Sequence, residues 1–384
     1  MAVVLFDKKE RRKLYPLNNC CAAAELRCGI FNALERWALI TGDNAYVHTA
    51  AHLAPLYAPV PAETHLWIDA SLIVDEALVK EMLSLEEGAY MADEHGLIAA
   101  KINIQSAEFD EALFASTAKL VATVRRIEYP WQIFQYNDAA IRADFELLTA
   151  RKKTAPLPEQ NNYLNPSQIF LEEGASVAFS SINASTGPVY IGRNTVIMEG
   201  SAIRGPFALC EGSVLKMGAK IYGATTIGPY CVVGGEVKNA VLQACSNKGH
   251  DGYLGDAVIG RWCNLGAGTS NSNVKNNAGL VKMWNAFSGG YAHVDVKCGV
   301  IMGDYSKTAI NSSLNTGTVI GSCCNVFGEG LLPTYIKDFE WGTKRFSRYE
   351  LDRAINDIAN WKKMKGQTLS DPEINVLKHI FEKF

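Results

Sequence analysis

The sequence lacks an apolar run long enough to cross a membrane, because no such stretch reaches about 18 residues. Its first residues, 1–7, are typical of a buried strand, and a charged turn at 8–13 follows them. This pattern does not resemble a signal peptide. Hydrophobic residues make up 48% and charged residues 20% of the chain, as in globular proteins. We therefore expect a protein that is neither exported nor membrane-spanning and that is cytoplasmic.

The chain also lacks a strong excess of either charge. Its formal net charge is −3, so no general basic field is present to attract nucleic acid or an anionic membrane surface. We expect neither as a partner. Locally basic clefts that hold a phosphate group remain compatible with this balance.

No pair of cysteines has the Cys-x-x-Cys spacing of a zinc or redox site, although the chain has 10 cysteines. Two pairs are directly adjacent, at 20–21 and 323–324, and most of the others lie inside apolar segments. Cysteine in such segments behaves as a small hydrophobic residue. The pattern favours reduced structural thiols and hence a reducing compartment.

The length of 384 residues favours two domains, and the first extends over residues 1–150. Short apolar runs alternate there with helical patterns, which is typical of an α/β sheet domain with a Rossmann-like arrangement. We expect strands at 3–6, 65–68 and 96–102, and helices at 22–39, 75–85 and 130–149. Residues 151–166, which are rich in Lys, Pro, Gln and Asn, are expected to form a linker.

A different pattern begins after the linker: aliphatic residues recur every six positions. They are Ile191, Ile197, Ile203, Leu209, Leu215, Ile221, Ile227 and Val233. A helix cannot use this period, because six residues turn through about 600° and scatter the side chains around its axis. An ordinary β-sandwich predicts irregular turns in place of a constant period. The spacing predicts a left-handed parallel β-helix over 167–335, in which each aliphatic residue points inward from one flat side.

The period is interrupted at 238–255 and again at about 270–296. Interruptions of a solenoid are commonly surface loops, and such loops often carry binding function. The last part of the chain, 336–384, is expected to be a helical extension with helices at 349–365 and 371–384. These helices could cap the open end of the solenoid or cross to a neighbouring subunit.

Residues 247–273 form the segment richest in chemically useful side chains. His250 lies between Gly249 and Gly252, which indicates an exposed and unusual backbone path. An imidazole is a suitable general base near neutral pH. A single histidine in a loop is, however, more often an ordinary surface residue.

This segment resembles the acetyltransferase half of the bifunctional N-acetylglucosamine-1-phosphate uridyltransferase/glucosamine-1-phosphate acetyltransferase family. The resemblance is carried by residues 249–250, 253–257, 259–260, 264, 266–269 and 273. It implies that His250 is the base for the sugar amino group and that Asn273 positions the acyl carbonyl or the amine.

The same resemblance implies substrate-binding roles for three further residues, which are Lys238, Tyr253 and Asn264. It further implies acetyl-CoA as co-substrate, a sugar phosphate or nucleotide sugar as the other substrate, and a homotrimer with active sites between solenoids. Lys307 and Thr308 are weaker candidates for contact with the donor, and ordinary packing at the coil surface explains them better.

The whole chain also resembles divergent sugar nucleotidyltransferase-like proteins, through residues 3–7, 15–17, 24–30, 66–70 and 141–149. Such enzymes wrap a nucleoside triphosphate with a glycine-rich loop after the first strand. Here residues 7–12 contain no glycine, so this site is divergent or lost. Arg11, Arg12 and Arg27 remain candidates for phosphate contact. Asp7 and Asp69 are candidate Mg²⁺ ligands if the first domain is active, or helix caps.

Three functions therefore stay open. The first is an acetyltransferase that acts on an amino-sugar 1-phosphate in nucleotide-sugar biosynthesis. The second is a sugar-1-phosphate nucleotidyltransferase in which the β-helix serves only oligomerisation. The third is a regulator that binds a nucleotide sugar and does not turn it over.

Overall fold

The first domain is built on a six-stranded sheet with the strand order β2-β1-β3-β5-β4-β6. The computed structural model describes residues 2–114, 119–120, 124–342 and 347–383. Strand β1 runs parallel to both of its neighbours, whereas β5 runs antiparallel to β3 and β4. The strands are β1 (Val3–Phe6), β2 (Tyr46–His48), β3 (Thr64–Asp69), β4 (Tyr90–Asp93), β5 (Gly96–Asn103) and β6 (Lys119–Leu120). The predicted α/β class is confirmed.

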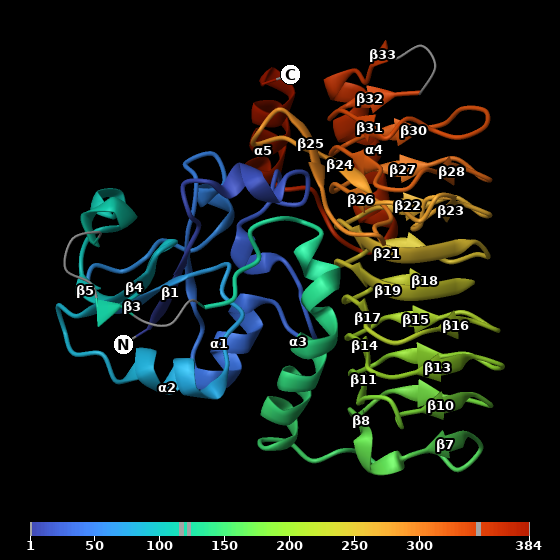
Figure 1. Ribbon diagram of the computed structural model, residues 1–384, viewed down its shortest axis with the longest axis horizontal. Helices are drawn as coiled ribbons and strands as arrows, with labels where there is room; N and C mark the ends of the chain where they lie inside the picture. Colours follow the sequence, from blue (N-terminus) through green and yellow to red (C-terminus); the bar gives the residue numbers. More distant parts are fainter. Residues whose placement is uncertain (1, 115–118, 121–123, 343–346, 384) are drawn as a thin grey trace.

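The α-helices of this domain are α1 (Ala33–Thr41), α2 (Glu76–Leu83) and α3 (Gln132–Thr149). Single 3-10 turns occur at Arg11–Leu14, Ala23–Glu25, Ala54–Leu56, Ser106–Glu108 and Glu111–Phe114. Helix α3 lies between the sheet and the solenoid (Figure 1). Its Asn137 side chain donates to the Ala224 carbonyl oxygen at 2.8 Å and to the Thr226 hydroxyl at 3.1 Å, which anchors the helix on the solenoid.

The predicted helix at 22–39 was wrong over its first half. The chain is extended after Glu25, and α1 starts only at Ala33, where Asn32 and Glu35 form a capping box. Gly29 has a φ of 87°, and a Cβ there would lie 2.4 Å from the Asp144 carboxylate. The apolar residues of this segment follow a helical spacing, but they divide between two buried clusters: Leu26 and Cys28 in the core of the first domain, and Ile30 with residues of α3 and the solenoid.

The second domain is a parallel β-solenoid with the inward-facing aliphatic residues that the six-residue period predicts. One row pairs Ile191, Leu209, Ile227, Leu242 and Ile259 across successive coils. All five side chains are fully buried. The predicted β-helix fold is confirmed, and its coils rise side by side along the right of Figure 1.

The solenoid strands form two large sheets and one small pair, and they extend beyond both ends of the range 167–335. Strand β7 begins within the segment that was predicted to be a linker. The strands are β7 (Asn162–Leu164), β8 (Ile169–Leu171), β9 (Ser176–Val177), β10 (Ser181–Asn183), β11 (Val189–Ile191), β12 (Val196–Ile197), β13 (Ala202–Arg204), β14 (Phe207–Leu209), β15 (Val214–Leu215), β16 (Lys220–Ile221), β17 (Thr225–Ile227), β18 (Val232–Val233), β19 (Glu236–Leu242), β20 (Asn247–Lys248), β21 (Tyr253–Ile259), β22 (Asn264–Leu265), β23 (Ser270–Asn271), β26 (Ile301–Met302), β27 (Lys307–Thr308), β28 (Ser313–Leu314), β29 (Val319–Ile320), β30 (Asn325–Val326), β31 (Tyr335–Ile336), β32 (Glu340–Trp341) and β33 (Ser347–Arg348). A 3-10 turn at Pro166–Gln168 joins β7 to β8.

The interruption at 238–255 is not a surface loop. Ile221 pairs with Val237 and Ile227 with Leu242, so this coil advances by 16 and 15 residues in place of the regular 18. Shortened corners therefore shift the period while the strands continue. The interruption at 270–296 does leave the solenoid, as a hairpin of β24 (Lys282–Asn285) and β25 (Gly290–His293).

The two C-terminal helices are α4 (Leu351–Met364) and α5 (Asp371–Glu382), which agrees with the predicted positions. They pack in one buried cluster with Leu53 of the first domain and with Tyr305 and Phe339 of the solenoid. Both helices therefore bind the domains of their own chain together. Among the described residues, no helix is both long and apolar enough to span a membrane.

Candidate functional site

His250 lies in the corner that joins β20 to β21, and its side chain is exposed. Its imidazole has no hydrogen bond or ion pair with any residue that the structure describes. The ring borders a groove of about 520 Å³ on the outside of the solenoid. The groove is lined by Lys216, Val232, Asn247, Gly249, His250, Asn264, Leu265, Gly266, Ala267, Ile310, Met364 and Lys365.

Directly beneath this corner, Lys248 occupies an interior position of the solenoid. It stands in the row between Val233 and Leu265, and only 2% of its surface is exposed. Its Nζ donates to the Gly234 carbonyl oxygen at 2.9 Å and to the His250 carbonyl oxygen at 3.1 Å. Burial lowers the pKa of Lys248 to about 8. The lysine thus connects the His250 corner to the preceding coil.

A second lysine closes the groove from the C-terminal side. Lys365, just after α4, donates from Nζ to the carbonyl oxygens of Tyr230 (2.9 Å) and Cys245 (3.0 Å) and to Asn247 Oδ1 (3.0 Å). Burial lowers its pKa. Sequence reasoning missed both lysines. The six-residue step from Leu242 to Lys248 was a usable signal for the first, whereas the second is brought in by a distant helix.

Asn273 belongs to a compact polar cluster on the neighbouring face of the solenoid. Its Nδ2 donates to the Tyr253 hydroxyl at 3.1 Å and to Asp256 Oδ2 at 2.5 Å. Asn239 donates to the other oxygen of Asp256 at 2.6 Å. Burial, followed by the Asp256 charge, raises the pKa of Tyr253 to about 12. The cluster leaves Asn273 Oδ1 without a hydrogen-bond donor among the described residues.

The five candidate residues divide between two faces of the coil. Asn264, in β22, pairs in register with Asn247 and lies in the groove beside His250. Lys238 is exposed on β19, next to Gly255 on β21, over which the Tyr253 ring lies. Lys238, Tyr253 and Asn273 therefore share the face that carries the cluster. The corner at 249–252 separates the two sets, and among the described residues no hydrogen bond joins His250 to Asn273.

Gly252 gives this corner its sharp path. Its φ is 125°, and a Cβ would lie 2.2 Å from the Thr269 carbonyl oxygen of the next coil. Only glycine fits so close an approach. The position of His250 thus depends on the packing of two successive coils.

The two weaker candidates have structural roles. Thr308 is buried inside the solenoid, where its hydroxyl lies 2.9 Å from that of Thr269. Lys307 lies 5.9 Å from the centre of the Trp361 ring, and burial lowers its pKa. Neither residue borders the His250 groove.

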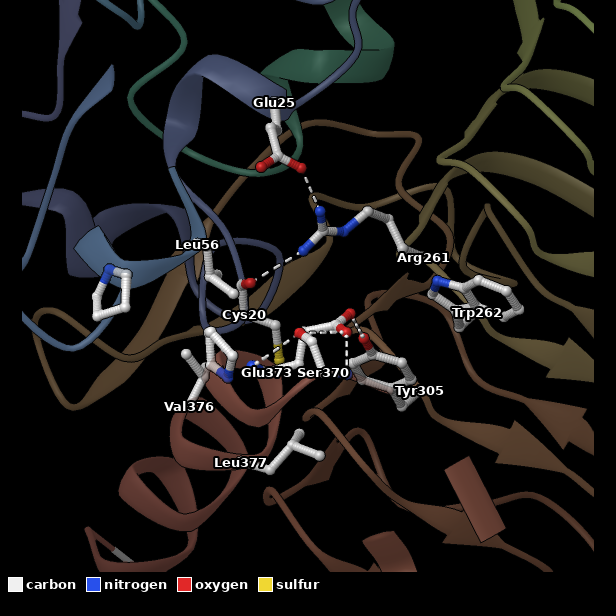
Figure 2. A pocket seen from close by; sticks show the side chains of 12 residues that line it. Cys20, Glu25, Leu56, Arg261, Trp262, Tyr305, Ser370, Glu373, Val376 and Leu377 are labelled. Carbon is white, nitrogen blue, oxygen red and sulfur yellow. Dashed lines mark hydrogen bonds and ion pairs between the residues drawn. The ribbon is translucent and has the colours of Figure 1, made fainter. Parts of the chain in front are cut away.

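Figure 2 shows a separate pocket of about 280 Å³ where the first domain, the solenoid and α5 meet. Arg261 points across it and forms an ion pair with Glu25, while its Nη2 donates to the Cys20 carbonyl oxygen at 3.0 Å. Its Nε also donates to Asp304 at 3.1 Å. Because these partners satisfy the guanidinium, Arg261 is a connection between domains.

The first domain matches a known family model. Residues 3–153 fit the model described as sugar nucleotidyl transferase. The first domain is thus similar to sugar nucleotidyl transferases. This match agrees with the resemblance predicted from the motifs of the N-terminal half.

Curated relatives of this sugar nucleotidyl transferase-like chain include several proteins named bifunctional protein GlmU. The one from Methanocaldococcus jannaschii is 35% identical over 116 residues, which are 30% of this chain and 27% of that protein. The one from Synechococcus sp. (strain CC9311) is 27% identical over 235 residues, 55% of this chain and 48% of that protein. The chain thus spans less than half the length of these relatives. The matches confirm the predicted resemblance and support the predicted class of enzyme, a transferase.

Similar solved structures include the polysialic acid O-acetyltransferase OatWY, with a TM-score of 0.31 and 15% identity over 49% of this chain and 87% of that one. The UDP-N-acetylglucosamine acyltransferase of Francisella novicida has a TM-score of 0.29 and 13% identity over 56% of this chain and 74% of that one.

In the first domain, Asp69 ends strand β3 and Asp7 directly follows the parallel strand β1. Ligands of such sheets bind at this edge. The Asp7 carboxylate already accepts hydrogen bonds from the Ala23 N–H (2.8 Å), the Thr49 hydroxyl (2.6 Å) and Arg11 (3.2 Å). Each of its oxygens is therefore engaged.

The Asp69 carboxylate is engaged in the same way. It accepts from the Ser71 N–H at 2.9 Å and from Arg126 Nε at 2.9 Å, and Arg126 also pairs with Asp93 at 2.5 Å. All three side chains of this ion-pair set are buried. Within the described residues, no group of three or more His, Cys, Asp or Glu side chains could hold a metal ion. The two predicted Mg²⁺ ligands are therefore already engaged by arginines and N–H groups of their own domain.

Proposed function

We propose that the protein transfers an acetyl group from acetyl-CoA to the amino group of an amino-sugar 1-phosphate, with His250 as general base. The observation that carries this proposal is the exposed, unpartnered imidazole at a solenoid corner. On one side of this corner lies the groove, and on the other lies the Asn273 cluster. The motif resemblance of residues 249–273 supports the same reaction.

In this reaction the imidazole accepts a proton from the sugar ammonium or amine as the nitrogen attacks the thioester carbon. A carbon–nitrogen bond forms, and a tetrahedral oxyanion results. The carbon–sulfur bond then breaks, the carbonyl is restored, and the CoA thiol leaves with the proton that the imidazole returns. The products are an N-acetylated sugar phosphate and free CoA.

The remaining candidates fit supporting roles. Asn273 has a free Oδ1, which can accept a hydrogen bond from the sugar amino group, because its Nδ2 is held by Tyr253 and Asp256. Lys238 supplies an exposed positive charge on the same face for the phosphate group. Asn264 lies beside His250 for sugar hydroxyls.

The two candidate faces both lie on the outside of the solenoid. A site of this kind is completed when a second solenoid packs against the corner and buries the substrate. We therefore include a homotrimer in the proposal, in which neighbouring subunits supply the two faces of one site.

The second candidate function is transfer of a nucleotidyl group to a sugar 1-phosphate, because residues 3–153 match the sugar nucleotidyl transferase model. The engaged carboxylates of Asp7 and Asp69 disfavour it. A regulator that binds a nucleotide sugar without turnover is the third candidate. No reaction step is assigned to the first domain.

The deciding experiment incubates the full chain with glucosamine 1-phosphate, acetyl-CoA, UTP and Mg²⁺ and follows the release of CoA and of pyrophosphate separately. We expect CoA release that depends on glucosamine 1-phosphate. The variant His250→Ala should lower kcat/KM by about 100-fold or more, as expected for loss of a general base. The matched control is His95→Ala, an exposed histidine of the first domain.

Three outcomes separate the candidates. Pyrophosphate release without CoA release would establish the second function and refute the first. Full CoA release by His250→Ala would show that another group is the base. Binding of a nucleotide sugar with neither product released would establish the third function.

A further inference from the structure

A pocket of about 360 Å³ lies between the first domain and the C-terminal helix α5, apart from the His250 groove. Residues from two ends of the chain line it. They are Arg11, Arg12, Tyr15, Asn18, Asn19, His52, His379, Ile380 and Lys383. Its volume lies within the range of small-molecule sites.

The charged side chains of this pocket are all basic. Arg12 and Lys383 are exposed, and neither side chain has a hydrogen bond or ion pair with any described residue. Among the residues that the structure describes, no carboxylate lines the pocket. The acidic side chain that acts on His379 is Glu382, on its own helix. Two unpaired cations thus face one cavity.

Arg11 differs from these two cations, because its guanidinium is used within the first domain. It donates to the carbonyl oxygens of Asn18 and Cys21, the latter at 3.1 Å, and forms an ion pair with Asp7 at 3.2 Å. Arg11 therefore adds positive charge to the pocket, but its hydrogen-bond donors are already used within the first domain.

Two histidines complete the lining as a stacked pair. The rings of His52 and His379 lie 4.1 Å apart between centroids with an interplanar angle of 18°. His379 Nε2 is buried and has no hydrogen-bond partner within the described part of the chain. Apart from Arg11, each segment of the pocket therefore contributes one cation and one imidazole. These are Arg12 and His52 from the first domain, and Lys383 and His379 from the end of the chain.

The groups in this pocket disfavour each other's protonation. Burial and then the charges of His379, Arg11 and Lys383 lower the pKa of His52 to about 4. Burial and then Arg11 and Arg12 lower the pKa of Lys383. An excess of positive charge in a partly enclosed cavity is relieved by a bound anion.

We propose that this pocket binds a phosphate or pyrophosphate group of a small phosphorylated molecule, with Arg12 and Lys383 as its two charged contacts and the neutral histidine pair as hydrogen-bonding partners. The anion bridges the first domain and α5. Guanidinium and ammonium groups are the side chains that most often hold phosphate oxygens in proteins.

This site would couple the C-terminal helix to the first domain. Since α5 also packs on the solenoid through Val376 and Leu377, an anion at its end would reinforce the contact among three parts of the chain. Binding requires neither His250 nor a metal ion, so the proposal is independent of the acetyl-transfer reaction.

The test is isothermal titration calorimetry of the full chain with inorganic pyrophosphate in Mg²⁺-free buffer that contains a chelator. We expect one site per chain. The double variant Arg12→Ala, Lys383→Ala should weaken binding by at least about tenfold, since each charged hydrogen bond contributes a factor of this order. The matched control, Arg151→Ala with Lys378→Ala, removes two exposed cations outside the pocket and should stay within about twofold of the wild type.

Further titrations identify the ligand and distinguish the anion site from the proposed acetyl transfer. Parallel titrations with inorganic phosphate and UDP show whether a lone phosphate or a diphosphate is preferred, and binding of either through Arg12 and Lys383 supports the site. The variant His250→Ala should bind pyrophosphate as the wild type does, whatever its acetyl-transfer activity. Equal affinity of the double variant and the wild type, or no binding of any of the three compounds, would overturn the proposal.

Discussion

Lys248 Nζ lies 3.1 Å from the carbonyl oxygen of His250 and donates a hydrogen bond to it from inside the solenoid. A lysine thus stands, two residues before the proposed base, in a row whose neighbouring coils place Val233 and Leu265 there. Its ammonium also bonds the Gly234 carbonyl oxygen at 2.9 Å. These two hydrogen bonds therefore join the interior of the coil to the exposed corner that carries His250.

This relationship predicts a pH-dependent stability. The folded-state pKa of Lys248 is lowered from 10.5 to about 8 by burial, so the unfolded chain binds more protons between these values. The free energy of unfolding due to this group therefore rises with pH from about 8 to 10.5, by at most about 3 kcal/mol. We expect the variant Lys248→Met to lack this rise. Urea unfolding of both proteins at pH 7 and pH 10 measures the difference, and equal changes in both would refute the assignment.

Gly252 predicts a steric effect on the same corner. An alanine there would combine a φ of 125° with a Cβ only 2.2 Å from the Thr269 carbonyl oxygen. We expect Gly252→Ala to lower the free energy of unfolding by about 2 kcal/mol or more and to reduce acetyl transfer, because the corner that carries His250 must move.

The control for this variant is Gly218→Ala. Gly218 has a φ of 69°, but a Cβ there would meet no atom within 4 Å. Thermal unfolding should show a loss of about 1 kcal/mol from backbone strain alone, with activity retained. A Gly252→Ala protein as stable and active as Gly218→Ala would show that the corner adapts to the larger side chain.

Substitution of Arg126 tests how strongly the buried ion pairs stabilise the first domain. It bonds Asp69 at 2.9 Å and Asp93 at 2.5 Å, and all three side chains are buried. The variant Arg126→Met would leave Asp93 without this cation and Asp69 with only Lys8, at 4.0 Å, and should destabilise the first domain by about 3–5 kcal/mol.

The exposed pair of Arg142 and Asp138 provides the comparison. Arg142→Met should change stability by less than about 1 kcal/mol, because surface ion pairs contribute little. Urea unfolding followed by tryptophan fluorescence measures both, since Trp67 is buried on β3 beside Asp69. Similar losses in the two variants would contradict this interpretation of the set.

The burial of the cysteines predicts that their thiols react slowly in the folded protein. All 10 are free and buried. Burial raises the pKa of every one of these thiols, so little thiolate is present at neutral pH. Titration with a thiol-specific disulfide reagent should detect almost none in the native protein and all of them in denaturant. Rapid reaction of several native thiols would show that a domain opens readily.

The sequence by itself determined the solenoid. A β-helix is a local repeat in which each coil packs mainly on its neighbours, so the six-residue spacing of residues such as Ile191 and Leu209 states directly which side chains face inward. The strands of the first domain were predictable for the same reason, because Val3–Phe6 and Thr64–Asp69 are short apolar segments of the central sheet. The chemical candidates were also visible, since His250 and Asn273 belong to a motif.

Only the tertiary structure decided how these candidates are arranged and what surrounds them. The helix expected at 22–39 is interrupted where the Ile30 and Phe31 N–H groups donate to Asp144 of the distant helix α3, in place of helical carbonyl oxygens. The Asp256 carboxylate reaches Asn239 and Asn273 through the stacking of coils, which no local spacing encodes. The basic pocket joins residues as far apart as Arg12 and Lys383. Contacts of this kind form only when coils and domains pack against each other. That packing depends on the shape and chemistry of complete surfaces, which a local sequence pattern does not specify.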